Sequence, residues 1–145
     1  MFSHILVPTD GSEASKNAIQ DCIAFAKEIG AKITGFHVVP EYRVFTYQPE
    51  MLEDTRDEFE KSSAQHAKVI LAEIETAAKA AGVNCETFFV TGDDPYEEII
   101  KVAKDKGCDL IAMASHGRKG VKGLLMGSET QKVLTHSHIP VLVLR

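Results

Sequence analysis

Short apolar runs alternate along this chain with longer stretches whose apolar residues recur at helical spacing. The first long stretch carries Ala18, Cys22 and Ala26 at intervals of four and is followed by Gly30, a pattern that predicts an amphipathic helix stopped by glycine. The apolar runs are mostly continuous, as is typical of strands covered by helices on both faces. This alternation predicts an α/β fold with a parallel sheet and right-handed crossovers. The expected strands are 5–7, 32–39, 85–90, 109–113 and 139–144.

Two of the expected helices begin with recognisable capping signals. Asp94 precedes Pro95, and Glu97 follows at the third helical position, so we predict Asp94 as the N-cap. Residues 128–131 read Ser-Glu-Thr-Gln, which repeats the capping-box pattern and predicts Ser128 as the N-cap of the last helix. A further helix is expected from about residue 52 to Gly82, after an irregular connection from Pro40.

Length and charge restrict the possible function. The 145 residues fit one domain spanning 1–145, and the net charge of −5 argues against general binding to nucleic acid or to an anionic membrane. No apolar run approaches the roughly 18 residues of a membrane span, and we recognise no signal peptide, so the cytoplasm is the expected location. The three scattered cysteines lack metal-ligand spacing and are expected to be buried in a reducing compartment.

The segment 113–128 is the strongest candidate for a binding site. An apolar run leads into a loop with four glycines and three basic residues, and the loop ends in Gly127-Ser128 at a predicted helix start. Glycine allows backbone N–H groups to face a ligand, and a helix N-terminus adds unpaired donors and a partial positive charge. This succession predicts phosphate binding. No Gly-Lys-Ser/Thr closes the loop, so it is not a P-loop.

Asp10 follows the first expected strand and is the second candidate. Ligands of open parallel sheets lie beyond the carboxyl ends of strands where the strand order reverses. If the first and fourth strands are neighbours, Asp10 and the glycine loop share one crevice. The alternative is that Asp10 only caps the turn before the first helix, together with Ser12. His116 lacks an evident nucleophilic partner and is interpreted as a structural hydrogen-bonding residue.

Taken together, these segments resemble the universal stress proteins of the UspA type. The matching segments are ILVPTDGS at 5–12, HV at 37–38, GDDP at 92–95, DLIAMASHGR at 109–118, GS at 127–128 and IPVLV at 139–143. The resemblance implies a Rossmann-like sheet with the strand order 3-2-1-4-5, counted along the chain. It also implies a homodimer through the C-terminal strand and binding of ATP with Mg²⁺, a cation that suits phosphate oxygens.

The resemblance also implies roles for individual residues. The adenosine would be bordered by Pro8, Thr9, Asp10 and Val38, and Met113 and Ala114 would line the floor near the ribose. The phosphates would be held through backbone N–H groups and hydroxyls by Gly117, Gly127, Ser128 and Thr130, in the family pattern Gly-x2-Gly-x9-Gly-Ser/Thr with Ala114 at its first position. From their charge alone, we expect weak electrostatic help from Arg118 and Lys119. Glu129 is expected beside the phosphates, where its carboxylate would repel them.

Three hypotheses about function remain open at this point. The leading one is a cytoplasmic, homodimeric, ATP-binding stress-response module whose surface changes when nucleotide binds. The second is a slow ATPase or self-phosphorylating protein, for which Asp10 is the only candidate to position metal or water. The third is an interaction module without nucleotide, favoured by Ala114 and Glu129.

Overall fold

Strands and helices alternate throughout the computed structural model, which describes residues 1–42, 49–116 and 126–145, with the side chains of 49–54 excepted. The strands are β1 (His4–Pro8), β2 (Lys32–Val39), β3 (Cys85–Thr91), β4 (Leu110–Ala114) and β5 (Val141–Leu144). The helices are α1 (Glu13–Ile29), α2 (Pro49–Ala81), α3 (Pro95–Asp105) and α4 (Ser128–His136). The predicted α/β class is confirmed.

The five strands form one parallel sheet in the order β3-β2-β1-β4-β5. This is the order implied by the resemblance. Pro8 of β1 pairs with Phe36 of β2, whereas Leu6 pairs with Ile111 of β4. β1 therefore lies at the centre of the sheet, and the chain extends from it first to one side and then to the other.

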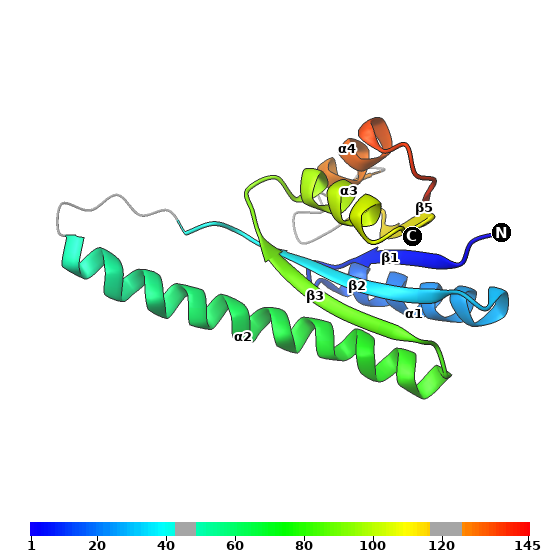
Figure 1. Ribbon diagram of the computed structural model, residues 1–145, viewed down its shortest axis with the longest axis horizontal. Helices are drawn as coiled ribbons and strands as arrows, with labels where there is room; N and C mark the ends of the chain where they lie inside the picture. The colour runs from blue at the N-terminus through cyan, green and yellow to red at the C-terminus, as the bar shows by residue number, and fades with distance from the viewer. Residues whose placement is uncertain (43–48, 117–125) are drawn as a thin grey trace.

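Helices cover both faces of the sheet, and each face has its own core (Figure 1). Neighbouring strand residues point to opposite faces, so Ile5 and Val7 pack under α1 and α2, whereas Leu6 packs under α3 and α4. Ile5 and Leu6 are both fully buried. Double coverage explains why the strand sequences are continuous apolar runs rather than alternating ones.

Gly35 brings α2 close to the sheet. A Cβ atom at this position would lie 3.0 Å from Cδ1 of Ile74 on α2 and 3.0 Å from Cγ2 of Thr87 on β3. Ile74 is fully buried. Any larger residue at position 35 would have to displace these two side chains, so the missing side chain of Gly35 sets the spacing between helix and sheet.

Several element boundaries differ from the predictions. β4 begins at Leu110 rather than Asp109, because the Asp109 carboxylate accepts hydrogen bonds from the backbone N–H groups of Ser3 (2.9 Å) and His4 (3.0 Å). This carboxylate ties the start of β1 to the start of β4. β5 begins at Val141, two residues later than predicted, and α2 begins at Pro49, slightly earlier than predicted.

The cysteines are reduced in this structure. All three cysteines are free, with Cys22 and Cys108 buried, and burial raises the pKa of Cys22 to about 12 and those of Cys85 and Cys108 to about 11. These thiols therefore stay protonated near neutral pH. Within residues 1–42, 49–116 and 126–145, no helix combines the length and the apolar character that a membrane span requires.

Candidate functional site

The strand order reverses between β1 and β4, which are hydrogen-bonded neighbours. The first and fourth strands are thus neighbours, which was the condition for Asp10 and the glycine loop to share one crevice. Asp10 follows β1, and the described start of the glycine loop follows β4. Val38 lies two residues beyond Phe36, the partner of Pro8, and so is level with Asp10. Crevices of this kind are where open parallel sheets bind ligands.

Thr9 extends β1 toward this crevice and is firmly held. Its N–H donates to the carbonyl of Phe36 (2.8 Å), and its own carbonyl is 2.8 Å from Nδ1 of His37. The Thr9 hydroxyl accepts the N–H of Gly11 at 3.1 Å, and Gly11 has a φ of 79°, a conformation that favours glycine. Pro8 beside it is half-buried. The end of β1 is therefore held in place beside β2.

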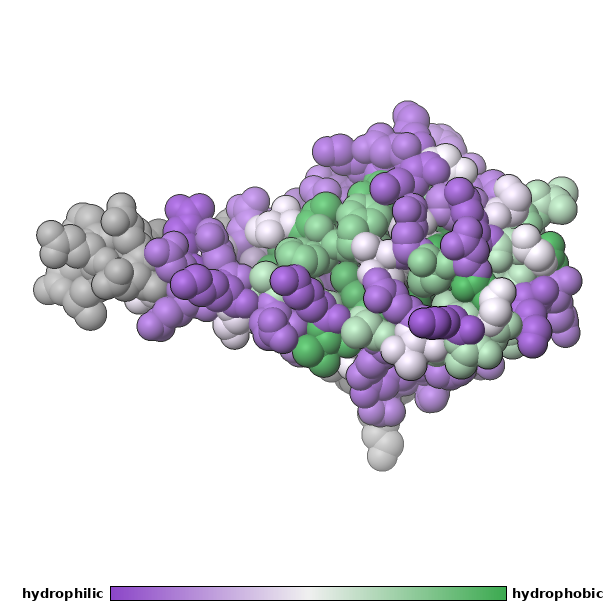
Figure 2. Space-filling model, turned by 60° about the horizontal axis from the view of Figure 1, so that its bottom comes forward, coloured by the Kyte–Doolittle hydropathy of each residue, from purple (hydrophilic) through white to green (hydrophobic). Residues whose placement is uncertain are grey.

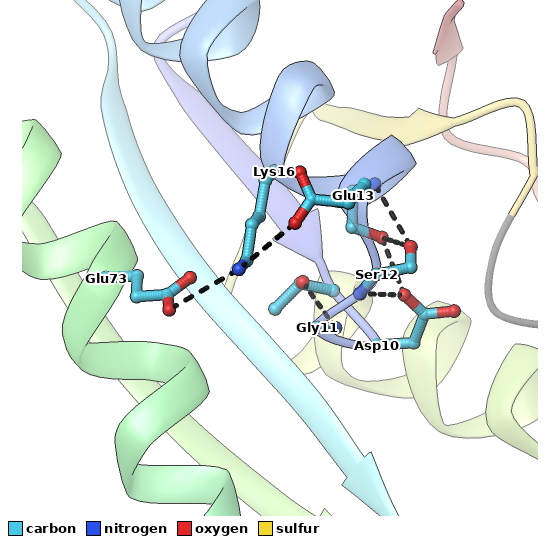
Figure 3. A network of polar contacts seen from close by, with 8 residues as sticks. Asp10, Gly11, Ser12, Glu13, Lys16 and Glu73 are labelled. Atoms are coloured by element: carbon cyan, nitrogen blue, oxygen red, sulfur yellow. Dashed lines mark hydrogen bonds and ion pairs between the residues drawn. The ribbon is translucent and has the colours of Figure 1, made fainter.

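Asp10 forms the polar network that opens α1 (Figure 3). Its Oδ1 accepts the N–H of Ser12 at 2.9 Å and the hydroxyl of Ser15 at 2.8 Å. Ser12 is the N-cap of α1, and its hydroxyl accepts the N–H of Ser15 at 3.2 Å. The capping interpretation of Asp10 is thus correct as far as Oδ1 is concerned. Contact between Asp10 and a ligand stays a prediction.

The end of β4 lies in the sheet between β1 and β5. Met113 and Ala114 are buried, with exposed fractions of 7% and 8%. The N–H of Gly127 donates to the carbonyl of Ser115, so both described ends of the glycine loop are joined. The Ser115 hydroxyl lies 2.8 Å from Nδ1 of His116, so this histidine has a serine partner that the sequence did not reveal. Its structural role stays a prediction. The predicted residues Gly117, Arg118 and Lys119 lie outside the described residues.

α4 begins one residue earlier than its capping pattern predicts. Gly127 is the N-cap, Ser128 is the first helical residue, and no side-chain bond caps this start. The prediction of Ser128 as the N-cap is wrong, because the Gly127 carbonyl already accepts the N–H of Gln131 at 3.0 Å and so opens the helix. Helix geometry leaves the N–H groups of Ser128, Glu129 and Thr130 without partners inside the helix.

Thr130 anchors the first turn of α4 to β4. Its hydroxyl donates to the Ala114 carbonyl at 2.9 Å, and the residue is only 4% exposed. This differs from the expected contact between the hydroxyl and a phosphate, since the hydroxyl already has a partner. The bond holds the first backbone N–H groups of α4, which have no partner within the helix, at the carboxyl end of β4, next to the end of β1.

Glu129 contacts the start of α3. Its Oε2 accepts the N–H of Tyr96 at 3.0 Å, and its Oε1 lies 3.3 Å from Nζ of Lys132. The same contact explains a second difference: Asp94 occupies the N-cap position of α3 but makes no side-chain capping bond, while Pro95 begins the helix as predicted. A carboxylate from α4 serves one of the unpaired donors of α3 instead.

Two residues of this region, Ser15 and Tyr96, were not predicted from the sequence, and neither was the capping contact of Glu129. Ser15 has a local signal, since Ser12 and Ser15 have the spacing at which an N-cap hydroxyl meets a backbone donor. The bond between Tyr96 and Glu129 joins residues 33 positions apart and has no local signal.

Two hollows lie away from the crevice. One, of about 570 Å³, lies between α1 and α2. Figure 2 shows the face at the bottom of Figure 1, on which apolar patches are framed by hydrophilic side chains. The other, of about 430 Å³, lies between α2 and the ends of β2 and β3. No group of three or more His, Cys, Asp or Glu residues able to hold a metal ion occurs in the described parts of the chain.

The sequence was also compared with known proteins. The model of the universal stress protein family matches residues 1–145. The universal stress protein YxiE of Bacillus subtilis is 35% identical, and the match covers 100% of both chains. Universal stress protein MJ0577 of Methanocaldococcus jannaschii is 30% identical, covering 100% of this chain and 96% of that protein.

Solved structures give the same result. The structure of MJ0577 matches with a TM-score of 0.85 at 33% identity, covering 99% of this chain and 96% of that one. UspA from Lactobacillus plantarum matches with a TM-score of 0.85 at 27% identity, covering 99% and 98%. A universal stress protein solved in complex with cAMP matches with a TM-score of 0.68 at 25% identity, covering 99% and 97%. The chain belongs to the universal stress protein family.

Proposed function

We propose that this chain is an ATP-binding, nucleotide-responsive stress-response module. The adenosine would lie between Pro8, Thr9, Asp10 and Val38 on one side and Met113 and Ala114 on the other. The phosphates would be held at the start of α4, with electrostatic help from Arg118 and Lys119 and a further contact from Gly117. One observation carries the proposal: the Thr130–Ala114 bond holds N–H groups that have no partner within their own helix at the end of β4, beside the end of β1.

The structure refines which backbone donors would serve the phosphates. The Gly127 N–H already donates to Ser115, so Gly127 would contribute mainly by letting the chain turn closely past the ligand. The phosphate donors in the described part of the site are then the N–H groups of Ser128, Glu129 and Thr130. Ser128 is exposed, which leaves its hydroxyl accessible to a phosphate oxygen.

Related proteins support a nucleotide as the ligand. The family includes a member solved with cAMP, which contains an adenine, a ribose and a phosphate group. With ATP, Mg²⁺ would be held by phosphate oxygens rather than by a dedicated set of side chains, in keeping with the preference of this cation for hard oxygen ligands.

The same proposal includes a homodimer formed through β5 and a cytoplasmic location. β5 is an edge strand of the sheet, and all of its side chains from Val141 to Leu144 are partly exposed. An apolar edge of this kind invites pairing with another strand, and a second copy of β5 would cover it. Three unpaired cysteines fit a reducing compartment.

Isothermal titration with Mg-ATP tests the proposed function. We expect saturable binding at or below millimolar concentrations, and we expect Ser128→Glu to weaken it because the variant adds negative charge where the phosphates would lie. Ser62→Glu adds the same charge on the exposed face of α2 and should bind like the wild type. Absence of binding by the wild-type protein would refute the proposal, and equal affinity of Ser128→Glu would refute the position of the phosphates.

A further inference from the structure

Glu129 links the first turns of two helices. Its carboxylate accepts the N–H of Tyr96, the second residue of α3, while its own backbone N–H belongs to the unpaired donors of α4. The N-termini of both helices carry partial positive charge, so a carboxylate between them is favourable to both. The negative charge of Glu129 is therefore fixed within one turn of the donors that would bind phosphate.

Within residues 1–42, 49–116 and 126–145, the charge of Glu129 is only partly offset. Lys132 lies 3.3 Å from Oε1, but the two side chains are 48% and 37% exposed, so water and salt weaken this ion pair. Lys132 is also positioned over the Tyr96 ring, 5.5 Å from its centre, which divides the ammonium group between two partners. An anion at the start of α4 would thus meet a held negative charge.

We propose that Glu129 is a positioning and specificity-determining residue for the phosphate end of the proposed site. It holds the starts of α3 and α4 together, and its charge penalises each further negative charge on the ligand. This inference rests on the proposed function, because it concerns the same site. It replaces the expectation of simple repulsion by a graded preference among nucleotides that differ in phosphate number.

Glu129→Gln separates the charge from the hydrogen bond, since the amide oxygen can still accept the Tyr96 N–H. In water, the interaction of two unit charges 4 Å apart changes an equilibrium constant about fivefold. ATP carries two more negative charges than AMP, and the repulsion between these two charges and Glu129 at about twice that distance adds up to a similar factor. In metal-free buffer, the ratio of ATP to AMP affinity should therefore rise about fivefold in Glu129→Gln. The rise should shrink at high ionic strength.

Two further variants serve as controls for the affinity ratio. Lys132→Gln removes the positive charge and should lower the ratio of ATP to AMP affinity. Glu58→Gln makes the same charge change on the exposed face of α2 and should leave the ratio unchanged. Opposite shifts at positions 129 and 132 would identify local charge as the cause, since a general loosening of the fold would move both in the same direction.

Amide hydrogen exchange at Tyr96 tests the positioning role without any nucleotide. Glu129→Ala should speed exchange of this N–H, whereas Glu129→Gln should leave it slow. The inference would be overturned by an unchanged ratio of ATP to AMP affinity in Glu129→Gln, or by equal exchange of the Tyr96 N–H in the wild type, Glu129→Ala and Glu129→Gln. If the wild type still binds nucleotide, either result would leave the proposed function intact. Absence of nucleotide binding by the wild type would overturn both.

Discussion

Thr130→Val is the most informative single substitution, because it removes one hydroxyl and nearly preserves side-chain volume. The hydroxyl donates to the Ala114 carbonyl at 2.9 Å, and the two residues are 4% and 8% exposed. The net loss of a hydrogen bond costs about 1 kcal/mol, and a poorly paired buried carbonyl adds to this, so we expect a loss of about 2 kcal/mol. For a chain of this size, that lowers the melting temperature by about 4–8 °C.

Urea unfolding without nucleotide measures this effect directly. The midpoint should fall in Thr130→Val with no change in the slope, since the native fold stays compact. Thr130→Ser keeps the hydroxyl and should retain more stability than the valine variant. The matched control is Thr135→Val on the same helix, whose exposed hydroxyl donates to the Gln131 carbonyl. We expect a change within about 0.5 kcal/mol.

The same experiment separates two roles of the Thr130 hydroxyl. An anchoring role predicts lost stability in the ligand-free protein and weaker nucleotide binding as a consequence of a displaced α4. A direct contact with phosphate predicts weaker binding and an unchanged urea midpoint. If Thr130→Val unfolds at the wild-type urea concentration, the reasoning from the Ala114 bond is wrong.

Two further predictions concern the core of the sheet. His4 is buried with Nε2 2.6 Å from the Thr34 hydroxyl, and burial lowers its pKa below 6.5. His4 of the unfolded chain therefore binds a proton more readily than His4 of the folded protein, so folding stability that is present above about pH 6.5 should be lost as the pH falls. In His4→Gln this loss of stability should be smaller. Urea midpoints measured between about pH 7.5 and 5 test it. Gly35→Ala should lower the free energy of unfolding by about 1–3 kcal/mol, because the new methyl group would press on Ile74 and Thr87. Thermal unfolding measures this loss. A gain in stability, as expected for alanine in an unhindered strand, would contradict the packing argument.

Periodicity was sufficient to predict the architecture. In α1, the residues at intervals of four, Ala18, Cys22 and Ala26, are all buried, and Gly30 ends the helix with a φ of 71°. These signals are local, since burial on one face of a helix and a left-handed C-cap are both encoded within a few residues. The strand order required the family resemblance, because no local pattern reports which strands become neighbours.

Contacts between distant segments could not be predicted from local patterns. Asp109 was predicted as the first residue of a strand, yet its carboxylate accepts a hydrogen bond from the backbone N–H of Ser3, 106 positions away. Glu129 was expected beside the phosphates at the start of its own helix, yet its carboxylate reaches Tyr96. In both cases the side chain serves the backbone of a different element, and the sequence near each residue carries no sign of that partner.

Several residues that the sequence pattern assigns to ligand binding also make hydrogen bonds that stabilise the fold. This double role affects how the site can be tested. Asp10 engages the start of α1 through Oδ1, and Thr130 engages β4 through its hydroxyl, so alanine at either position removes a structural bond along with any ligand contact. The two roles are compatible, because a carboxylate has two oxygens and the first turn of a helix has several donors. It follows that loss of binding in such alanine variants does not identify a ligand contact. Variants that change charge but keep the internal bond, such as Glu129→Gln, are the ones whose effect on binding can be assigned to the ligand.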